Sequence, residues 1–327
     1  MVKFQAVPFS PKFIDSLIDL INIATAGRRN RIQISISSLN NRVLSHPAFD
    51  AKGLVLAIDE TEEVVGAVHA IVPAIDIPPY NRLEGQGFII GPYVRETNRR
   101  GGIGSALLQV AESFLKSGCD QINIHGLRAP IYHAQEGPRQ PLFGSTEMMG
   151  LTWDDHQFLE FLRACKYEVV EGREISMLAL LKPNEPSSIR KLNLKELSKV
   201  RITPEHPWEG KVKWVDGVER GYGFERFNIT TPYHVIALSK GDTLVGHCLW
   251  YPMSKKDRAA LFDLRVEPSF RGRGLGRYLI EVALVDMAVA GFREVELHTS
   301  PQRNPVAYKL YNKLNFFEVA EWLTLAK

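Results

Sequence analysis

One stretch of this chain occurs twice, at a spacing of a whole domain. The segment VRETNRRGGIGSALL begins at Val94, and VEPSFRGRGLGRYLI begins at Val266. Arginine, glycine and leucine positions coincide along the pair at a constant offset of 172 residues. A repeat of this period is too long for a solenoid and matches the length of one domain. The sequence therefore predicts two copies of one fold in a single chain.

The resemblance between the halves extends to both sides of these segments. A predicted hairpin precedes each segment, at residues 53–73 and 233–252, and an amphipathic helix, a strand and a second helix follow it. This order of elements predicts an α/β architecture in each half. Prolines and serines around residue 185 suit a linker. We therefore expect domains at residues 1–184 and 185–327.

Composition excludes several classes of protein. The 327 residues are 45% apolar and 24% charged, as in globular proteins, and the net charge of +3 is too small for a general nucleic-acid binder. There is no secretory signal pattern, and no apolar run approaches the ~18 residues of a membrane span. Cys119, Cys165 and Cys248 form no metal-binding or disulfide pattern. We expect a cytoplasmic monomer or homodimer without metal, nucleic-acid or membrane partners.

The two glycine-rich loops each lie between a predicted strand and a predicted helix. A helix start presents free N–H groups and a positive dipole, which together bind anions. Glycines let the backbone approach a diphosphate closely, and Arg271 and Arg273 add charge. Arg277 and Ser105 stand where the strict dinucleotide pattern needs its third glycine, and no GxxxxGK[ST] run occurs. The loops indicate a phosphorylated cofactor held mainly by main chain; the alternative is a tight turn with solvated arginines.

The second loop resembles the acyl-CoA loop of the GNAT superfamily of N-acyltransferases, Arg/Gln-x-x-Gly-x-Gly/Ala. The segment NPVAYKLYNKLNFFEV is similar to a later motif of the family, matched here by Asn304, Ala307, Leu310, Tyr311 and Phe316. Asn315 replaces the usual glycine, and asparagine tolerates a left-handed backbone. The arrangement is similar to that of tandem GNAT proteins, which include the mycothiol synthases.

The resemblance implies a mixed seven-stranded sheet in each domain. It also implies that the fourth strand bulges away from the fifth, and that the pantetheine arm of acetyl-CoA or another acyl-CoA lies in the gap. The residues expected to bind this co-substrate in the second half are Leu264, Val266, Arg271, Gly272, Arg273, Gly274, Leu275, Gly276 and Asn304. Those expected in the first half are Val94, Arg99, Arg100, Gly101, Gly102, Ile103 and Gly104.

Acyl transfer to an amine needs an acid that protonates the departing sulfur, and the resemblance assigns this role to Tyr311. The alternative is a packing residue, since Tyr308 and Tyr311 share a helix face. In the first half Leu162 and Asp155 stand at the positions of Tyr311 and Asn304. Leucine cannot give a proton, so the chemistry is expected in the C-terminal half.

The sequence indicates the base that deprotonates the amine less clearly than it indicates the acid. Asp263, in the predicted fourth strand, is the expected catalytic carboxylate, and its counterpart in the first half is Gly91. His298 and His125 end the matching fifth strands, where a shared structural role is the stronger interpretation. His247 is a further candidate.

One long insert is found only in the first half. It spans residues 127–153 and is rich in proline and glycine. Long segments of this kind are usually functional or interface loops. Tyr132 or His133 is able to act from it, although a structural role is favoured for each.

The sequence is best interpreted as an acetyl-CoA-dependent N-acetyltransferase acting on a primary amine of a small molecule or peptide. Residues 28–50 and 203–227 differ most between the halves and are expected to shape the acceptor side. One alternative is a non-catalytic acyl-CoA-binding sensor or scaffold. Another is a tandem interaction module with vestigial loops, which would have no CoA affinity.

Overall fold

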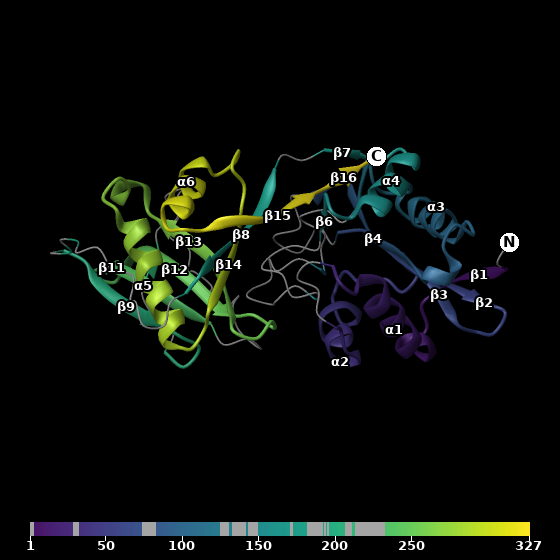
Figure 1. Cartoon of the computed structure of the whole chain (residues 1–327), viewed down its shortest axis with the longest axis horizontal. Coiled ribbons are helices and arrows are strands. Elements are labelled where there is room, and N and C mark those ends of the chain that lie inside the picture. The colour runs from purple at the N-terminus through teal and green to yellow at the C-terminus, as the bar shows by residue number, and fades with distance from the viewer. Residues whose placement is uncertain are drawn as a thin grey trace. The chain divides into compact units, whose positions relative to one another are not determined.

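The computed structural model of the chain consists of two compact units. The structure describes residues 3–28, 33–73, 83–124, 131–132, 142, 150–170, 173–181, 192, 194, 196–206, 211–212 and 233–327. Unit 1 comprises the described residues within 1–133, 141–173 and 321–327, and unit 2 those within 134–140 and 174–320. Each unit consists of a mixed sheet with helices packed against it (Figure 1). The predicted fold class is therefore confirmed.

The sheet of unit 1 has the strand order β1-β2-β3-β4-β5-β16-β7. Its strands are β1 (Phe4–Pro8), β2 (Leu54–Asp59), β3 (Val64–Ile71), β4 (Gln86–Val94), β5 (Gln121–Ile124), β7 (Glu168–Val169) and β16 (Leu325–Ala326). Its helices are α1 (Ile14–Thr25), α2 (Ile36–Leu39), α3 (Ile103–Leu115) and α4 (His156–Ala164), with short helical turns at Pro11–Phe13, Asn40–Leu44 and Glu96–Asn98. Alternating strand residues face opposite sides: Leu54 and Leu56 pack with α1 and α2, whereas Val55 and Ala57 pack with α3 and α4.

The second sheet has the order β6-β15-β8-β14-β13-β12-β11-β9, with β10 paired to β12. Its strands are β6 (Leu151–Thr152), β8 (Glu174–Leu180), β9 (Ser198–Ile202), β10 (Lys211–Val212), β11 (His234–Lys240), β12 (Thr243–Pro252), β13 (Arg258–Val266), β14 (Glu294–Thr299) and β15 (Phe317–Leu323). Helices α5 (Leu275–Val289) and α6 (Pro305–Lys313) pack on one face, and a 3-10 turn at Pro268–Phe270 precedes α5. The sheet has nine strands where seven were expected, because short strands such as β6 and β10 are added.

Each half of the sequence ends in a strand that pairs within the sheet built mainly by the other half. β8 lies between β14 and β15, and β16 lies between β5 and β7. Figure 1 shows the teal arrow of β8 among green and yellow strands. The compact units therefore do not follow a simple division into residues 1–184 and 185–327. The proposed linker at residues 182–191 lies outside the described residues, and that boundary stays a prediction.

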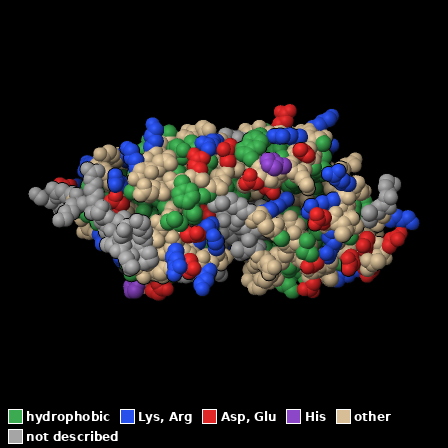
Figure 2. Space-filling model, in the orientation of Figure 1, with side chains coloured by type: hydrophobic (Ala, Val, Ile, Leu, Met, Phe, Trp, Pro, Cys, Tyr) green, Lys and Arg blue, Asp and Glu red, His purple; other side chains and the backbone are tan. Residues whose placement is uncertain are grey.

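Two surface properties bear on the classes of protein considered above. Among the described residues, no helix is both long enough and apolar enough to cross a membrane. On the face shown in Figure 2, basic and acidic side chains are interspersed rather than gathered by sign. Such a mixed surface agrees with the small net charge of +3.

Candidate active site

Strands β13 and β14 pair in parallel at one end and separate at the other. The pairing ends at Leu261 and Leu297, although both strands continue beyond these residues. The register between β12 and β13 shifts next to Leu249, so that Phe262 is an extra residue in β13. A bulge of this kind bends a strand and ends its pairing. The bulge and the gap expected for the fourth strand are both present.

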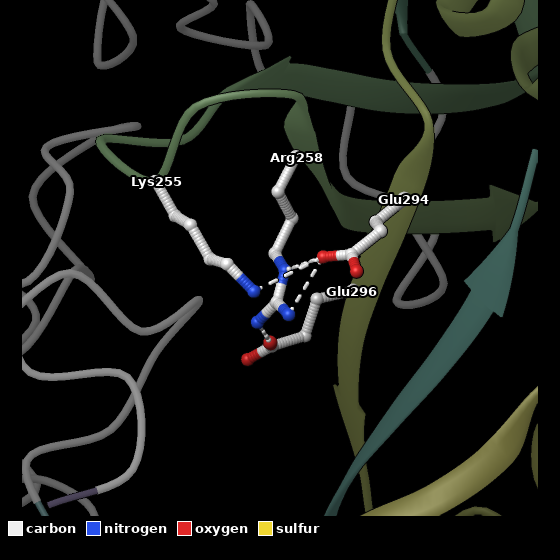
Figure 3. A network of polar contacts seen from close by, with 4 residues as sticks. All are labelled: Lys255, Arg258, Glu294 and Glu296. Atoms are coloured by element: carbon white, nitrogen blue, oxygen red, sulfur yellow. Dashed lines mark hydrogen bonds and ion pairs between the residues drawn. The ribbon is translucent and has the colours of Figure 1, made fainter. Parts of the chain in front are cut away.

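A buried ionic network holds the paired end of these two strands (Figure 3). Arg258 of β13 lies 2.6 Å from a carboxylate oxygen of Glu296 and 2.8 Å from one of Glu294, while Lys255 lies 3.2 Å from Glu294. The side chain of Arg258 is 5% exposed and that of Glu296 is fully buried. Burial alone would raise the pKa of the Glu294 carboxyl, but Arg258 and Lys255 outweigh it and lower the pKa. The strand pair is thus fixed at one end and open at the other.

The glycine-rich loop of the second half leads from β13 into α5. Arg271 is extended and its Nε donates to the Val266 carbonyl over 2.9 Å. Gly272 and Gly274 have φ angles of +77° and +80°, and the helix begins at Leu275. A Cβ at Gly272 would meet nothing within 4 Å. The loop therefore turns bare backbone and the start of a helix toward open space, which is the geometry of an anion site.

The loop of the first half repeats this backbone with the residue types exchanged. Arg99 is extended, Arg100 has a φ of +60°, Gly102 has a φ of +86°, and α3 begins at Ile103. Arg100 thus holds the left-handed position that Gly272 holds in the second loop. The two loops therefore have the same backbone conformation although their glycines are at different positions, so it is the backbone conformation that the two halves share.

A cavity of about 610 Å³ lies beside the loop in unit 1. Arg99, Arg100 and Gly102 line it from the loop, Tyr93 from β4 and Phe161 from α4. The other expected residues in this half differ in their position. Val94 and Gly104 also line the cavity, whereas Ile103, the first residue of α3, is buried in the core.

Tyr311 lies on α6, on the same face of the sheet as α5. Its side chain is 6% exposed and its ring packs against Phe316 at 5.7 Å between centroids. Leu310, the preceding residue, would be 3.7 Å from a Cβ at Gly276, so this turn of α6 packs beside the end of the loop. Asn315, just after the helix, has the expected left-handed backbone with a φ of +63°.

Three residues related to Tyr311 by the motif have surroundings of their own: its neighbour Tyr308, its first-half counterpart Leu162, and Asn304. The Tyr308 hydroxyl donates to Glu318 over 2.6 Å. Leu162, the counterpart of Tyr311, is fully buried in the core between α3 and α4. Asn304 is the residue before α6, and its side chain makes no capping hydrogen bond.

Two carboxylate–imidazole pairs lie on the opposite face of the second sheet. In the first pair Nε2 of His247 is 3.0 Å from Oδ2 of Asp263, and Nε of Arg265 is 3.5 Å from Oδ1. In the second pair Nε2 of His298 is 3.1 Å from Oε2 of Glu174, which begins β8. Asp263, His247 and His298 are separate candidates in the sequence, and Glu174 is not among the predicted residues. Glu174 lies 124 residues before His298, and no sequence signal links them.

The first half has a different polar group at the corresponding face. Nδ1 of His69 lies 3.0 Å from the Tyr132 hydroxyl, while its Nε2 is buried with no hydrogen-bond partner among the described residues. Burial lowers the pKa of His69 to about 3 and raises that of Tyr132. Gly91, at the position of Asp263, has a φ of +97° in the bulge of β4. His125 and His133 lie outside the described residues.

Comparison with known proteins places the second half in a sequence family. The sequence model of the Acetyltransferase (GNAT) family matches residues 200–316. An uncharacterized N-acetyltransferase of Methanocaldococcus jannaschii is 36% identical over 84 residues, which cover 24% of this chain and 37% of that protein. The chain thus spans little more than a third of the length of this curated relative.

Solved structures resemble the chain over its whole length. A tandem GNAT protein from the clavulanic acid biosynthesis pathway superposes with a TM-score of 0.71 at 15% identity, covering 99% of this chain and 98% of that one. A GCN5-related N-acetyltransferase from Sphaerobacter thermophilus gives a TM-score of 0.62 at 16% identity, covering 99% and 95%. At these identities the likeness shows the fold.

The chain thus has two mixed sheets, each with a glycine-rich loop that leads from a bulged strand into a helix. Residues 200–316 match the model of the GNAT acetyltransferase family, and the whole chain shares the fold of a solved tandem GNAT protein.

Proposed function

We propose that the second domain transfers an acyl group, in the first place acetyl, from acyl-CoA to a primary amine of a small molecule or peptide. One observation carries the proposal. The gap between β13 and β14 opens beside the loop at residues 271–276, with Tyr311 on one face of the sheet and the pairs of Asp263 and His298 on the other. A donor and an acceptor are thereby able to approach the same gap from opposite faces.

The residues present fit an acyl-CoA. The open space over Gly272 accommodates a diphosphate, Gly274 likewise has no Cβ, and Arg271 and Arg273 supply the opposite charge. Beyond Leu261, β13 is no longer paired with β14. The main chain there, around Leu264 and Val266, is available to pair with an amide-containing arm as an added strand would. When bound, the co-substrate supplies an activated acyl thioester.

The remaining chemistry belongs to side chains of this chain. Tyr311 donates its hydroxyl proton to the sulfur as the bond to carbon breaks, which avoids release of a bare thiolate. Asp263 attracts the acceptor's ammonium group to the other face of the sheet. These two residues give the acid and the acceptor site of the reaction.

The first domain is proposed to bind acyl-CoA without catalysing transfer. The cavity beside Arg99 and Gly102 supports binding, and Leu162 in place of Tyr311 removes the acid. In this proposal one domain senses or stores the co-substrate that the other consumes. The non-catalytic sensor is therefore a second candidate function for this half alone.

Calorimetric titration of acetyl-CoA into the full-length protein tests both assignments. Gly274→Glu and Gly102→Glu each place an acidic side chain in one loop, which repels and obstructs a diphosphate. We expect each variant to lose one binding site, and only Gly274→Glu to abolish turnover. Equal loss of turnover in both variants would contradict the assignment of chemistry to the second domain.

A further inference from the structure

The pair of Glu174 and His298 lies where β13 and β14 separate. His298 directly follows Leu297, the last residue of β14 that pairs with β13. The side chains of His298 and Glu174 are each only 4% exposed, and Arg303 contacts the other carboxylate oxygen of Glu174. His298 as a whole residue is partly exposed, so its accessible part is main chain. A buried imidazole is thus held at the start of the gap by a carboxylate that is itself held by a cation.

The hydrogen-bond partners define which nitrogen of His298 is basic. Burial alone would raise the pKa of the Glu174 carboxyl, but the hydrogen bond from His298 and the charge of Arg303 outweigh it and lower the pKa. An ionised carboxylate only accepts, so Nε2 of His298 carries the hydrogen. Nδ1 is then the nitrogen with a free lone pair. It is buried, and it has no hydrogen-bond partner among the described residues.

Nδ1 of His298 belongs to a residue at the point that the reacting end of a bound ligand would reach. A ligand anchored at the loop of residues 271–276 and extended back along β13 reaches the point where β13 and β14 meet. His298 is the first residue of β14 past that point, and Asp263 is the matching residue just past the bulge of β13. Both side chains lie on the face opposite α5, away from Tyr311.

We propose that Nδ1 of His298 takes the proton from the acceptor's ammonium group, and that Glu174 is the positioning residue that makes this nitrogen available. The inference rests on the proposed transferase function. Asp263 suits this step less well, because His247 and Arg265 already face its two oxygens. A carboxylate behind an imidazole fixes its tautomer and stabilises the imidazolium that forms.

The protons and bonds of the step balance. One proton passes from the ammonium group to Nδ1 of His298, and the amine lone pair that remains forms the carbon–nitrogen bond. The carbon–sulfur bond breaks with its electron pair on sulfur, which takes the Tyr311 proton. The amide nitrogen loses its extra proton and Tyr311 regains one. One ammonium and one thioester thus become one amide, one thiol and one free proton.

Nitrogen-15 NMR of labelled histidines in the full-length wild-type protein gives a test independent of turnover. The charged groups placed against His298 by the described residues are Glu174 of β8 and, through it, Arg303. We expect the neutral form of His298 to carry its hydrogen on Nε2 rather than on Nδ1, and Glu174→Gln to disturb this tautomer. A hydrogen on Nδ1 and none on Nε2 would overturn the proposal.

Kinetics with acetyl-CoA and a panel of primary amines gives the second test. His298→Gln should lower kcat by about 10²- to 10⁴-fold with an unchanged Kd for acetyl-CoA. The loss should shrink as the pH approaches the pKa of the amine, because free amine then needs no base. Glu174→Gln should lower kcat and alter the acid limb of the pH profile, with partial rescue in Glu174→Asp. His156→Gln, at the exposed start of α4, should have no effect.

The outcomes separate this inference from the function on which it rests. Wild-type turnover in a folded His298→Gln variant would overturn the role of His298 and leave the transferase function standing. A wild-type protein that does not bind acetyl-CoA would overturn both. Calorimetry and thermal unfolding of each variant distinguish lost chemistry from a lost fold, and the NMR test needs no variant at all.

Discussion

At the scale of single residues, Arg100 and Gly272 show that the loop imposes one backbone on two residue types. Both have a left-handed φ, of +60° and +77°, although only glycine adopts it without strain. A Cβ at Gly272 meets no atom within 4 Å, so Gly272→Ala should cost about 1 kcal/mol of stability through the backbone alone. Arg100→Gly should raise stability by a similar amount. Urea unfolding midpoints check this, and shifts of the same sign in both variants would contradict it.

Tyr311 and Tyr308 provide a matched pair for testing the acid. Tyr311→Phe removes the proposed proton donor, so kcat should fall by about 10²- to 10⁴-fold while acetyl-CoA affinity stays. Tyr308→Phe removes a hydroxyl that donates to Glu318, so stability should fall by about 1 kcal/mol without loss of kcat. Steady-state kinetics and thermal unfolding of both variants make the comparison. Equal kcat values in the two variants would show that Tyr311 is a packing residue.

His69 makes the stability of unit 1 depend on pH. Its pKa is lowered to about 3 by burial, so the folded unit binds fewer protons than the unfolded chain below the ordinary histidine value of 6.5. Stability should therefore be complete above pH 6.5 and fall by up to about 1.4 kcal/mol per pH unit as the pH drops toward 3. Unfolding midpoints from pH 7 to pH 4 measure this. His69→Gln should flatten the dependence of stability on pH. An unchanged slope of stability against pH in this variant would show that other groups cause the dependence.

At the scale of elements, the strand pair of β13 and β14 combines a rigid end with an open end. Arg258 and Glu296 are buried together at the rigid end. Removing one partner of a buried pair leaves an uncompensated charge, so Arg258→Met should cost about 3–5 kcal/mol. Arg258→Met combined with Glu296→Gln should cost less than the sum of the single variants. A double-mutant cycle by urea unfolding measures the coupling, and strict additivity would contradict a direct interaction.

Elements near the loops are also where sequence and structure agree best. The hairpin of β2 and β3, the amphipathic α3 and α5, and the loop before each of these helices are all local patterns, and each half repeats them. The family resemblance predicted a bulge in the fourth strand and its separation from the fifth. The structure has the bulge at Phe262 and the separation after Leu261. The partners of the histidines were not predictable. Glu174 reaches His298 only because β8 pairs with β14, and strand pairing across 124 residues leaves no local signal.

At the scale of the whole molecule, the sequence repeat suggested two self-contained halves. In the structure, each sheet includes a strand from the other half of the sequence. β8 and β16 end corresponding halves, and neither strand's pattern says which sheet receives it. Specific contacts hold β16 in the sheet of unit 1. Lys327 lies 3.1 Å from Glu112 of α3, whose carboxylate also accepts from the Tyr167 hydroxyl over 2.9 Å. The exchange depends on such long-range contacts rather than on propensity.

The exchange predicts the behaviour of the two halves when they are produced separately. Residues 1–184 alone would keep β8 without β14 and would lack β16, whereas residues 185–327 alone would leave an edge of β14 bare. Ile175 and Met177 of β8, both fully buried in the native sheet, would be exposed, and unpaired strand edges aggregate. We therefore expect each half to be insoluble alone, and co-expression to yield a one-to-one complex that binds acetyl-CoA. Size-exclusion chromatography and circular dichroism distinguish these states. A folded, monomeric half on its own would show that the exchanged strand is dispensable for folding.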